Sequence, residues 1–205
     1  MSIDEILNHN RIFPVLTIHQ LGDAIPLCSA LLDGGLTVLE ITLRTPTALD
    51  AIEQIKGRFP EACLGVGTLL ESSDFDRALN AGASFAVSPG LNMDLVKDAN
   101  KAGISYLPGV QTNSEAMTAY RAGLRFLKFF PAKSAGGSDM LKQFYPLYPE
   151  LMFCPTGGVK FHDAASYLSE PNVICIGGSF ASPSEFVKNR DWQGISQLAR
   201  QAAAL

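Results

Sequence analysis

A lysine stands inside an apolar, aromatic run of this chain. The run reads "RFLKFFPAKSAGG", and Lys128 lies between Leu127 and Phe129. Taken alone, a lysine in such a run usually buries only its stem and keeps its charge in water at a sheet edge. Apolar surroundings in general disfavour a charged amine, and the neutral amine has the lone pair that attacks a ketone. Lys128 is therefore a candidate Schiff-base nucleophile if other reactive groups converge on it.

The segment "LEITLRT" places a carboxylate and a guanidinium four residues apart, at Glu40 and Arg44. In an extended strand this spacing points both side chains to the same face. One interpretation is a structural ion pair at the end of the strand. In the other interpretation, the planar guanidinium of Arg44 binds a substrate carboxylate and Glu40 transfers protons. The segment alone leaves both interpretations open.

Two glycine pairs follow the last two apolar segments, Gly157–Gly158 and Gly177–Gly178, and Ser179 comes directly after the second. Without Cβ atoms, glycines let backbone N–H groups approach an anion closely. Either pair alone fits a tight turn equally well. In a parallel barrel, however, the loops after the seventh and eighth strands are the usual phosphate site. The two pairs together predict a phosphorylated substrate.

The sequence predicts no metal site and no cofactor. The three histidines, His9, His19 and His162, show no spacing typical of metal ligands. The run "GVGTLL" lacks the third glycine of a dinucleotide-binding fingerprint, so a nicotinamide cofactor is not expected. The cysteines form no CxxC pair and are expected to be reduced core residues, namely Cys28, Cys63, Cys154 and Cys175.

Short apolar runs alternate with amphipathic segments along the whole chain. Eight runs are expected to be strands, at 13–18, 37–43, 63–68, 84–89, 104–108, 125–130, 151–155 and 173–178. The segments between them read as helices, and a short helix is expected at about residues 2–10. No linker or composition break divides the chain. The pattern predicts a single-domain (β/α)8 TIM barrel over residues 1–205, and an open doubly wound sheet is the alternative.

Polar residues gather at the ends of the predicted strands. They are Glu40, Thr42, Arg44, Thr68, Ser88, Lys128, Thr156 and Ser179. Four of the strands also end in a proline, which has no N–H to continue a ladder: Pro89, Pro108, Pro131 and Pro155. In a closed barrel these strand ends meet at one mouth, where the active sites of that architecture lie. Lys128 would then have the partners that its chemistry needs.

Composition limits the class of partner. The 205 residues carry a net charge of −4 and no cluster of Lys and Arg, so nucleic-acid binding is not expected. The N-terminal "MSIDEILNHNR" lacks the basic region and apolar core of a signal peptide, and no apolar stretch is long enough for a membrane helix. The prediction is a cytoplasmic protein that acts on a small molecule.

Six motifs in this order, "LEITLRT", "GVGT", "SPGLN", "LKFFPA", "CPTGGV" and "CIGGS", closely resemble the 2-keto-3-deoxy-6-phosphogluconate (KDPG) aldolase family. These enzymes are also described as 4-hydroxy-2-oxoglutarate (KHG) aldolases. The resemblance implies a class I carbon–carbon lyase on a (β/α)8 barrel, without a cofactor and typically a homotrimer. It also implies a place in Entner–Doudoroff carbohydrate metabolism. The implied reactions are cleavage of KDPG to pyruvate and glyceraldehyde 3-phosphate, and of KHG to pyruvate and glyoxylate.

By this resemblance Lys128 is the Schiff-base lysine and Glu40 the general acid/base, while Arg44 and Thr68 contact the pyruvate carboxylate. The other implied substrate-binding residues are Pro89 and, in the phosphate-side loops, Thr156, Gly157, Gly158, Gly178 and Ser179.

The chain departs from the family pattern at two positions. Lys133 follows "KFFPA" where many relatives carry an acidic residue, and Gln111 stands where a smaller hydroxyl residue is common. Both leave the substrate preference open. Two other classes also remain: a phosphosugar isomerase or epimerase that uses Glu40 as a base without a covalent adduct, and a non-catalytic sugar-phosphate-binding barrel.

Overall fold

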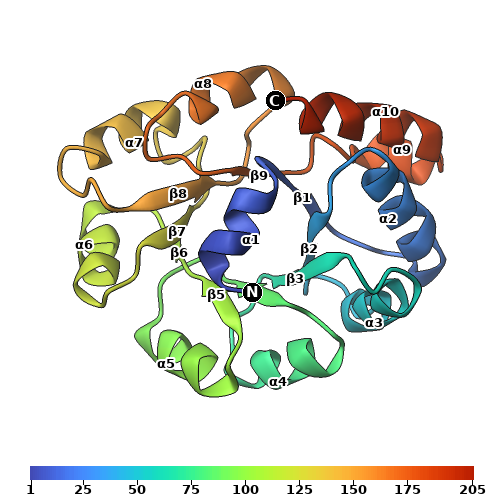
Figure 1. Cartoon of the computed structure of the whole chain (residues 1–205), viewed down its shortest axis with the longest axis horizontal. Helices are drawn as coiled ribbons and strands as arrows, with labels where there is room; N and C mark the ends of the chain where they lie inside the picture. The colour runs from blue at the N-terminus through green and yellow to red at the C-terminus, as the bar shows by residue number, and fades with distance from the viewer.

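The computed structural model describes residues 1–205 as alternating parallel strands and helices (Figure 1). The strands are β1 (Ile12–Leu16), β2 (Val38–Thr42), β3 (Cys63–Gly67), β4 (Phe85–Val87), β5 (Ser105–Leu107), β6 (Gly109–Val110), β7 (Phe126–Phe129), β8 (Met152–Pro155) and β9 (Ile176–Gly178). The helices are α1 (Ile3–His9), α2 (Ala24–Asp33), α3 (Ala48–Arg58), α4 (Ser73–Asn80), α5 (Met93–Ala102), α6 (Asn113–Arg121), α7 (Gly137–Phe144), α8 (Ala164–Leu168), α9 (Ser184–Lys188) and α10 (Trp192–Ala203). Each predicted strand and helix is present at its expected place.

The strands form two parallel sheets, and the prediction of a closed eight-stranded barrel is wrong. Six strands pair in the order β5-β4-β3-β2-β1-β9, and three pair in the order β6-β7-β8. The expected strand at 104–108 corresponds to β5, and the unpredicted β6 follows it directly but belongs to the other sheet. The two sheets together line the middle of the molecule, with helices around them (Figure 1).

Two seams interrupt the ladder, and both contain a proline. At the first seam, Pro108 separates β5 from β6; it has no N–H to donate, although its carbonyl accepts from the Lys128 amide at 2.9 Å. At the second seam, β8 meets the β9 segment only through isolated bridges, Phe153↔Val173 and Thr156↔Gly177. The partner offset grows from 20 to 21 residues between these bridges (173 − 153 and 177 − 156), so one extra residue breaks the register.

The main core lies between the strands and the surrounding helices. It is a cluster of 46 buried hydrophobic residues, to which every strand from β1 to β3 contributes its outward-facing side chains, such as Leu16, Leu39 and Leu64. Strands of a parallel sheet that are covered on both faces are expected to be largely apolar, and the inward-facing Glu40, Thr42 and Lys128 are exceptions here. Local signals position the covering helices: Asn92 caps α5 by accepting from two backbone N–H groups, and Thr112 with Glu115 forms the capping box of α6.

A second, smaller cluster fills the interior on the other side of the strands. Its 10 buried residues include Ile6 and Leu7 of α1, which pack against inward-facing side chains such as Phe13, Val38 and Phe85. Figure 1 shows α1 in the middle of the ring of strands. This short helix therefore closes one end of the interior and keeps water from entering there.

Side-chain alternation follows from the strand geometry. In β2, Val38 belongs to the interior cluster, whereas Leu39 and Ile41 belong to the outer core. Glu40 and Thr42 share the face of Val38 and therefore point into the interior, as the spacing predicted. In β7, Lys128 lies two residues after Phe126, which packs against the interior cluster.

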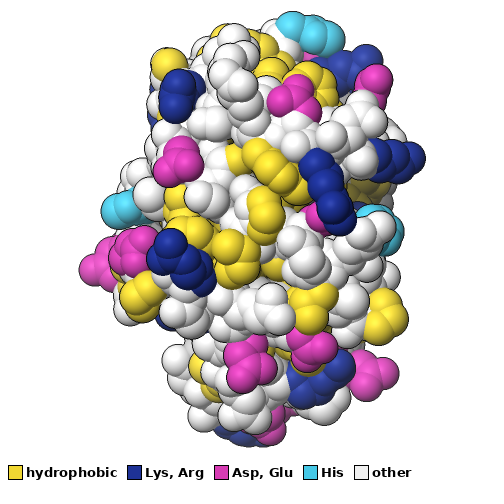
Figure 2. Space-filling model, turned by 90° about the vertical axis from the view of Figure 1, so that its right-hand side faces the viewer, with side chains coloured by type: hydrophobic (Ala, Val, Ile, Leu, Met, Phe, Trp, Pro, Cys, Tyr) yellow, Lys and Arg dark blue, Asp and Glu magenta, His cyan; other side chains and the backbone are white.

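The surface carries mixed charge. On the face drawn in Figure 2, basic and acidic side chains are interspersed and no large patch of one sign is present. None of the helices combines the length and the hydropathy that spanning a lipid bilayer requires.

Candidate functional site

A buried ion pair lies between the two sheets. Nζ of Lys128, on β7, is 3.3 Å from Oε1 of Glu40, on β2, and the two side chains are only 4% and 5% exposed. Nζ also lies 5.1 Å from the centre of the Phe130 ring. An unpaired charge in such a place would be very costly, and here each side chain lies beside a group of the opposite charge type. The spacing is also short enough for a proton to pass between them.

The backbone around this pair is shaped to hold the Glu40 carboxylate. Gly67 at the end of β3 is the close neighbour: a Cβ atom at this position would overlap Oε1 of Glu40. Glu40 is paired in register with Gly65, whose missing Cβ leaves room for the Phe85 ring. Any larger residue at Gly67 would push Glu40 towards Lys128 or out of the interior.

Two threonines connect β1 to β2 beside the pair. Oγ1 of Thr42 donates to the Leu16 carbonyl at 3.0 Å, and Thr17 Oγ1 lies 3.0 Å from Thr42 Oγ1. Thr42 is fully buried, and these contacts satisfy its hydroxyl. They fix the carboxyl end of β2, from which Arg44 extends.

Arg44 and Thr68, which the family resemblance pairs as contacts of the pyruvate carboxylate, touch each other in the structure. Nε of Arg44 donates to Thr68 Oγ1 at 3.2 Å, which leaves the outer edge of the guanidinium free. Thr68 has φ of +62°, a left-handed conformation that is a genuine outlier for a β-branched residue. Backbone strain of this kind persists where surrounding contacts enforce it, and it is concentrated at functional sites.

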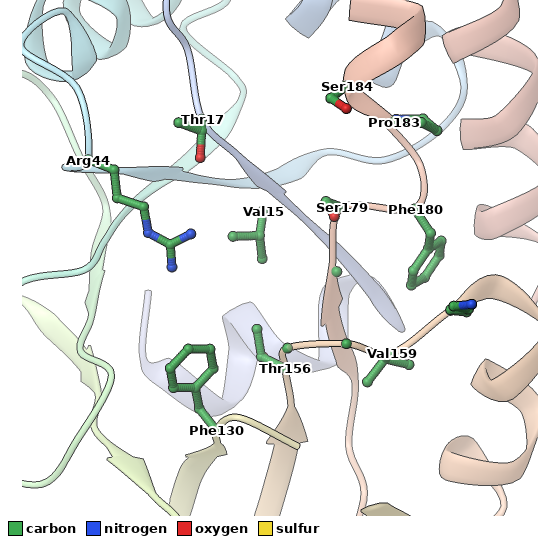
Figure 3. Close-up of a pocket in the computed structure, with 14 residues that line it drawn as sticks. Val15, Thr17, Arg44, Phe130, Thr156, Val159, Ser179, Phe180, Pro183 and Ser184 are labelled. Atoms are coloured by element: carbon green, nitrogen blue, oxygen red, sulfur yellow. The ribbon is translucent and has the colours of Figure 1, made fainter. Parts of the chain in front are cut away.

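A pocket of about 580 Å³ opens beside the buried pair (Figure 3). Its lining consists of Val15, Thr17, Arg44, Phe130, Thr156, Gly157, Gly158, Val159, Lys160, Gly178, Ser179, Phe180, Pro183 and Ser184. In Figure 3 the Arg44 guanidinium points into the cavity from one side, and Val159, Ser179 and Phe180 lie on the opposite side. The pocket adjoins the buried pair through Phe130 and through Thr156, whose hydroxyl donates to the Cys154 carbonyl at 3.2 Å. Cys154 is the register partner of Lys128.

The predicted phosphate loops form one wall of this pocket. Gly157 and Gly158 have φ of +94° and +76°, a conformation that glycine adopts without strain. Here the conformation turns the chain sharply after β8, and the Gly157 carbonyl accepts from the Lys133 amide at 3.0 Å. A Cβ at Gly177 would overlap the Thr156 hydroxyl, so this glycine is needed for the second loop to approach the first.

The pocket lining does not include Glu40, Thr42, Thr68, Ser88, Pro89 or Lys128. Ser88 accepts a hydrogen bond from the Tyr106 phenol at 2.6 Å and donates to the Gly90 carbonyl at 2.7 Å, so it holds the loop after β4. Pro89 is half-buried and does not line the pocket, but its carbonyl packs against Gly109, the register partner of Lys128 on β6.

Eight residues of the pocket lining were not predicted from the sequence: Val15, Thr17, Phe130, Val159, Lys160, Phe180, Pro183 and Ser184. Strand alternation was a usable signal for Thr17, because it follows Val15 by two residues. The same spacing relates Phe130 to Lys128. Lys160 lies in an irregular segment and Ser184 begins the short helix α9, so no strand period says which way either side chain points.

The cysteines are buried rather than presented as nucleophiles, although a hydrogen bond with Cys175 lowers the pKa of Cys154. All four are free and buried. Burial raises the pKa of Cys28 to about 12 and that of Cys175 well above its usual value, which favours the unreactive thiol. No group of three or more His, Cys, Asp or Glu side chains is arranged to hold a metal ion.

Parallel strands, a buried lysine–carboxylate pair and a cation-lined pocket define a class: α/β enzymes that act on small anionic molecules. The chain belongs to the KDPG and KHG aldolase family, whose model matches residues 3–198. It is 44% identical over 200 residues to a 2-dehydro-3-deoxy-phosphogluconate aldolase of Pseudomonas aeruginosa, covering 98% of this chain and 91% of that protein.

Solved structures agree with this membership. The KDPG aldolase of Legionella pneumophila, described with pyruvate captured at low pH as a covalent carbinolamine intermediate, superimposes with a TM-score of 0.96 at 40% identity, covering 99% of this chain and 98% of that chain. The KDPG aldolase of Zymomonas mobilis, described with 3-phosphoglycerate, gives a TM-score of 0.93 at 42% identity over 98% and 95% of the two chains.

Proposed function

We propose that this protein is a class I aldolase that cleaves KDPG to pyruvate and glyceraldehyde 3-phosphate. One observation carries the proposal: Lys128 Nζ lies 3.3 Å from Glu40 Oε1 in the dry interior, beside a pocket that Arg44 lines. Family membership supports the same reaction, and the names of the relatives support it for those proteins. Cleavage of KHG to pyruvate and glyoxylate is a second candidate activity, because the family description includes it.

The pair suggests the order of the first steps. Glu40 accepts a proton from Lys128, and the neutral amine attacks the C2 ketone to form a carbinolamine. Loss of water then gives an iminium, which accepts the electron pair of the C3–C4 bond. Glu40 is well placed to move protons throughout, because its carboxylate is confined beside Nζ by Gly67.

Cleavage follows from the same groups. A base removes the C4 hydroxyl proton, the C3–C4 bond breaks, and glyceraldehyde 3-phosphate leaves while the pyruvate enamine stays on Lys128. We assign the base role to Glu40, directly or through a water. Protonation of the enamine at C3 and addition of water to the iminium then release pyruvate and restore the amine.

Binding residues are assigned by their position relative to Lys128. Arg44, with Thr68 behind it, would bind the C1 carboxylate, and Pro89 would shape the floor near β6. The opposite wall would bind the phosphate through Thr156, Gly157, Gly158, Gly178 and Ser179.

We also propose, on family resemblance, a single domain, a homotrimer and a cytoplasmic location. Light scattering on the purified protein would test the trimer.

Covalent trapping tests the proposed activity. The protein is incubated with pyruvate and borohydride, which reduces an iminium to a stable amine, and intact mass and peptide mapping follow. We expect one pyruvate-derived adduct at Lys128 and none in Lys128→Met. Lys133→Met is the matched control and should label as the unmodified protein does. Labelling at Lys133, or no labelling, would favour an isomerase, an epimerase or a non-catalytic barrel instead.

A further inference from the structure

Lys160 is a residue of the pocket to which neither the sequence motifs nor the proposed chemistry gives a task. It is the second residue after the Gly157–Gly158 turn, and it directly follows Val159, which is buried and anchors the loop. Lys160 itself is exposed and lines the pocket. Its backbone position is held by a hydrogen bond from its N–H to Asp163 Oδ2 at 3.4 Å.

The charge of the pocket lining is one-sided. Of the residues that form the wall, only Arg44 and Lys160 are charged, and no Asp or Glu is among them. The lining is therefore purely basic in its charged residues, although the chain as a whole has more acidic residues (20) than basic ones (16). The smaller neighbouring pocket, of about 290 Å³, is different: Glu71 and Asp74 line it together with Arg77.

The Lys160 ammonium is free to meet a ligand. It takes part in none of the ion pairs of the structure, as is also true of Lys133 and Lys188, whereas Lys97 and Lys101 pair with carboxylates on their own helix. The nearest acidic residue in sequence, Asp163, is engaged by the Lys160 backbone and by His162 Nε2 at 3.3 Å. A lysine on a flexible stem without a carboxylate partner is a mobile point charge that suits a phosphate group.

We propose that Lys160 determines the preference for a phosphorylated substrate by contacting the terminal phosphate across the Gly157–Gly158 loop. The proposal rests on the proposed aldolase function and deepens it. Arg44 would bind the carboxylate at one end of the substrate and Lys160 the dianion at the other, while neutral N–H and hydroxyl groups position the phosphate between them. Both charges of the substrate would then face a cation.

The proposal predicts which substrates should depend on Lys160. KDPG carries its phosphate on C6, far from the C1 carboxylate. KHG is a five-carbon dicarboxylate whose second charge is attached directly to C4, beside the bond that breaks, so it does not extend to the glycine loop. Removal of Lys160 should therefore lower kcat/KM for KDPG and leave KHG cleavage nearly unchanged.

Lys133 provides a matched control. Its side-chain stem packs against Gly158, where a Cβ would lie 2.8 Å from the Lys133 Cβ, and its backbone bonds to the same loop. Lys133 is exposed, but it does not line the pocket. Lys133→Met and Lys160→Met each remove one positive charge beside the Gly157–Gly158 loop, so they change the long-range electrostatic field alike. They differ because only Lys160 lines the pocket.

The experiment measures kcat/KM for KDPG and KHG in the unmodified protein, Lys160→Met, Lys160→Arg and Lys133→Met. For KDPG we expect Lys160→Met to lose about tenfold, as for a lost contact to a charged group. Lys160→Arg should recover most of this, and Lys133→Met should stay within about twofold, as substitutions away from special contacts usually do. Rising ionic strength should also lower kcat/KM for KDPG less in Lys160→Met than in the unmodified protein.

Three results would overturn the assignment: equal losses on KDPG and KHG, no loss on KDPG, or an equal loss in Lys133→Met. An unmodified protein that cleaves KHG but does not prefer KDPG would overturn it as well. Failure of the aldolase proposal is recognised separately, because the borohydride trap with pyruvate needs no phosphate and would then leave Lys128 unlabelled.

Discussion

The site has a dry end and a wet end, and they are built differently. Lys128 and Glu40 lie on regular strands in the interior, almost without exposure, and each is fixed by register and by a glycine or aromatic neighbour. Ser179 and Lys160 lie in exposed loops after β9 and β8. The difference separates tasks: a proton transfer needs fixed distances and low water, whereas recognition of a distant phosphate tolerates movement and solvent.

The two ends also connect the two sheets in different ways. At the dry end a charged pair spans the interior from β2, in the six-stranded sheet, to β7, in the three-stranded sheet. At the wet end the β8 and β9 loops meet at the second seam, where Thr156 and Gly177 form an isolated bridge. Because the ladder is interrupted there, backbone groups at the strand ends are not all committed to a sheet.

The largest effect is expected from the dry end. Glu40→Gln keeps the shape of the side chain and removes its capacity to accept a proton. We expect kcat to fall on the order of 10²-fold or more, while pyruvate and borohydride still label Lys128 to some degree. Rapid-quench and steady-state kinetics with KDPG would measure this. Full turnover in the variant would remove Glu40 from the proton transfers.

Gly67→Ala tests whether confinement of the carboxylate matters. The added Cβ would overlap Glu40 Oε1, so the carboxylate must move. A displacement near 1 Å at a catalytic group can cost up to about 10²-fold, and crowding of a packed interior typically costs about 1 to 3 kcal/mol of stability. We expect losses in both kcat and melting temperature. Gly57→Ala is the control, because a Cβ there meets no atom within 4 Å. A normal kcat in Gly67→Ala would mean that Glu40 tolerates displacement.

Ser179→Ala tests the wet end. The variant should lose about 1 to 3 kcal/mol of transition-state stabilisation with KDPG, the range for a hydrogen bond to a charged group, and little with KHG. The ratio of kcat/KM for the two substrates in the two proteins is the measurement. Equal losses on both would assign Ser179 to the fold or to the whole site rather than to the phosphate.

No change is expected from chelation. The side chains that reach the site do not form a cluster with the composition of a metal centre. Overnight dialysis against a chelator should therefore leave KDPG cleavage as it was, in a direct assay of pyruvate release. If activity disappeared on chelation and returned when a divalent ion was added, the expectation that no metal takes part would be wrong.

The sequence allowed correct inference where a strand's own period decides the outcome. Glu40 and Thr42 share the inward face of β2 because successive side chains of any strand alternate. Gly157 and Gly158 form a turn with backbone angles that few other residues adopt, whereas Gly177 and Gly178 belong to β9 and have no such angles. The roles of these residues in binding and catalysis stay predictions.

The closure of the barrel was misjudged although its signal was present. Pro108 and Pro155 have no N–H to continue a ladder, and the two seams lie at these positions. Eight strands in sequence predict a closed barrel only if hydrogen bonds are available to join each neighbouring pair. A count says how many strands pack around an interior, but only the pairing of each N–H and C=O says whether the ladder closes.

By itself, the sequence determined the order of strands and helices, the inward face of Glu40 and Lys128, and the places where the chain must turn, because these depend on residues near one another in the chain. Tertiary structure alone decided that Lys128 Nζ meets Glu40 across 88 residues of sequence, that two seams divide the sheets, and that Lys160 and Arg44 line one pocket. Those outcomes depend on how distant segments pack and on which hydrogen bonds that packing permits, and no local pattern contains that information.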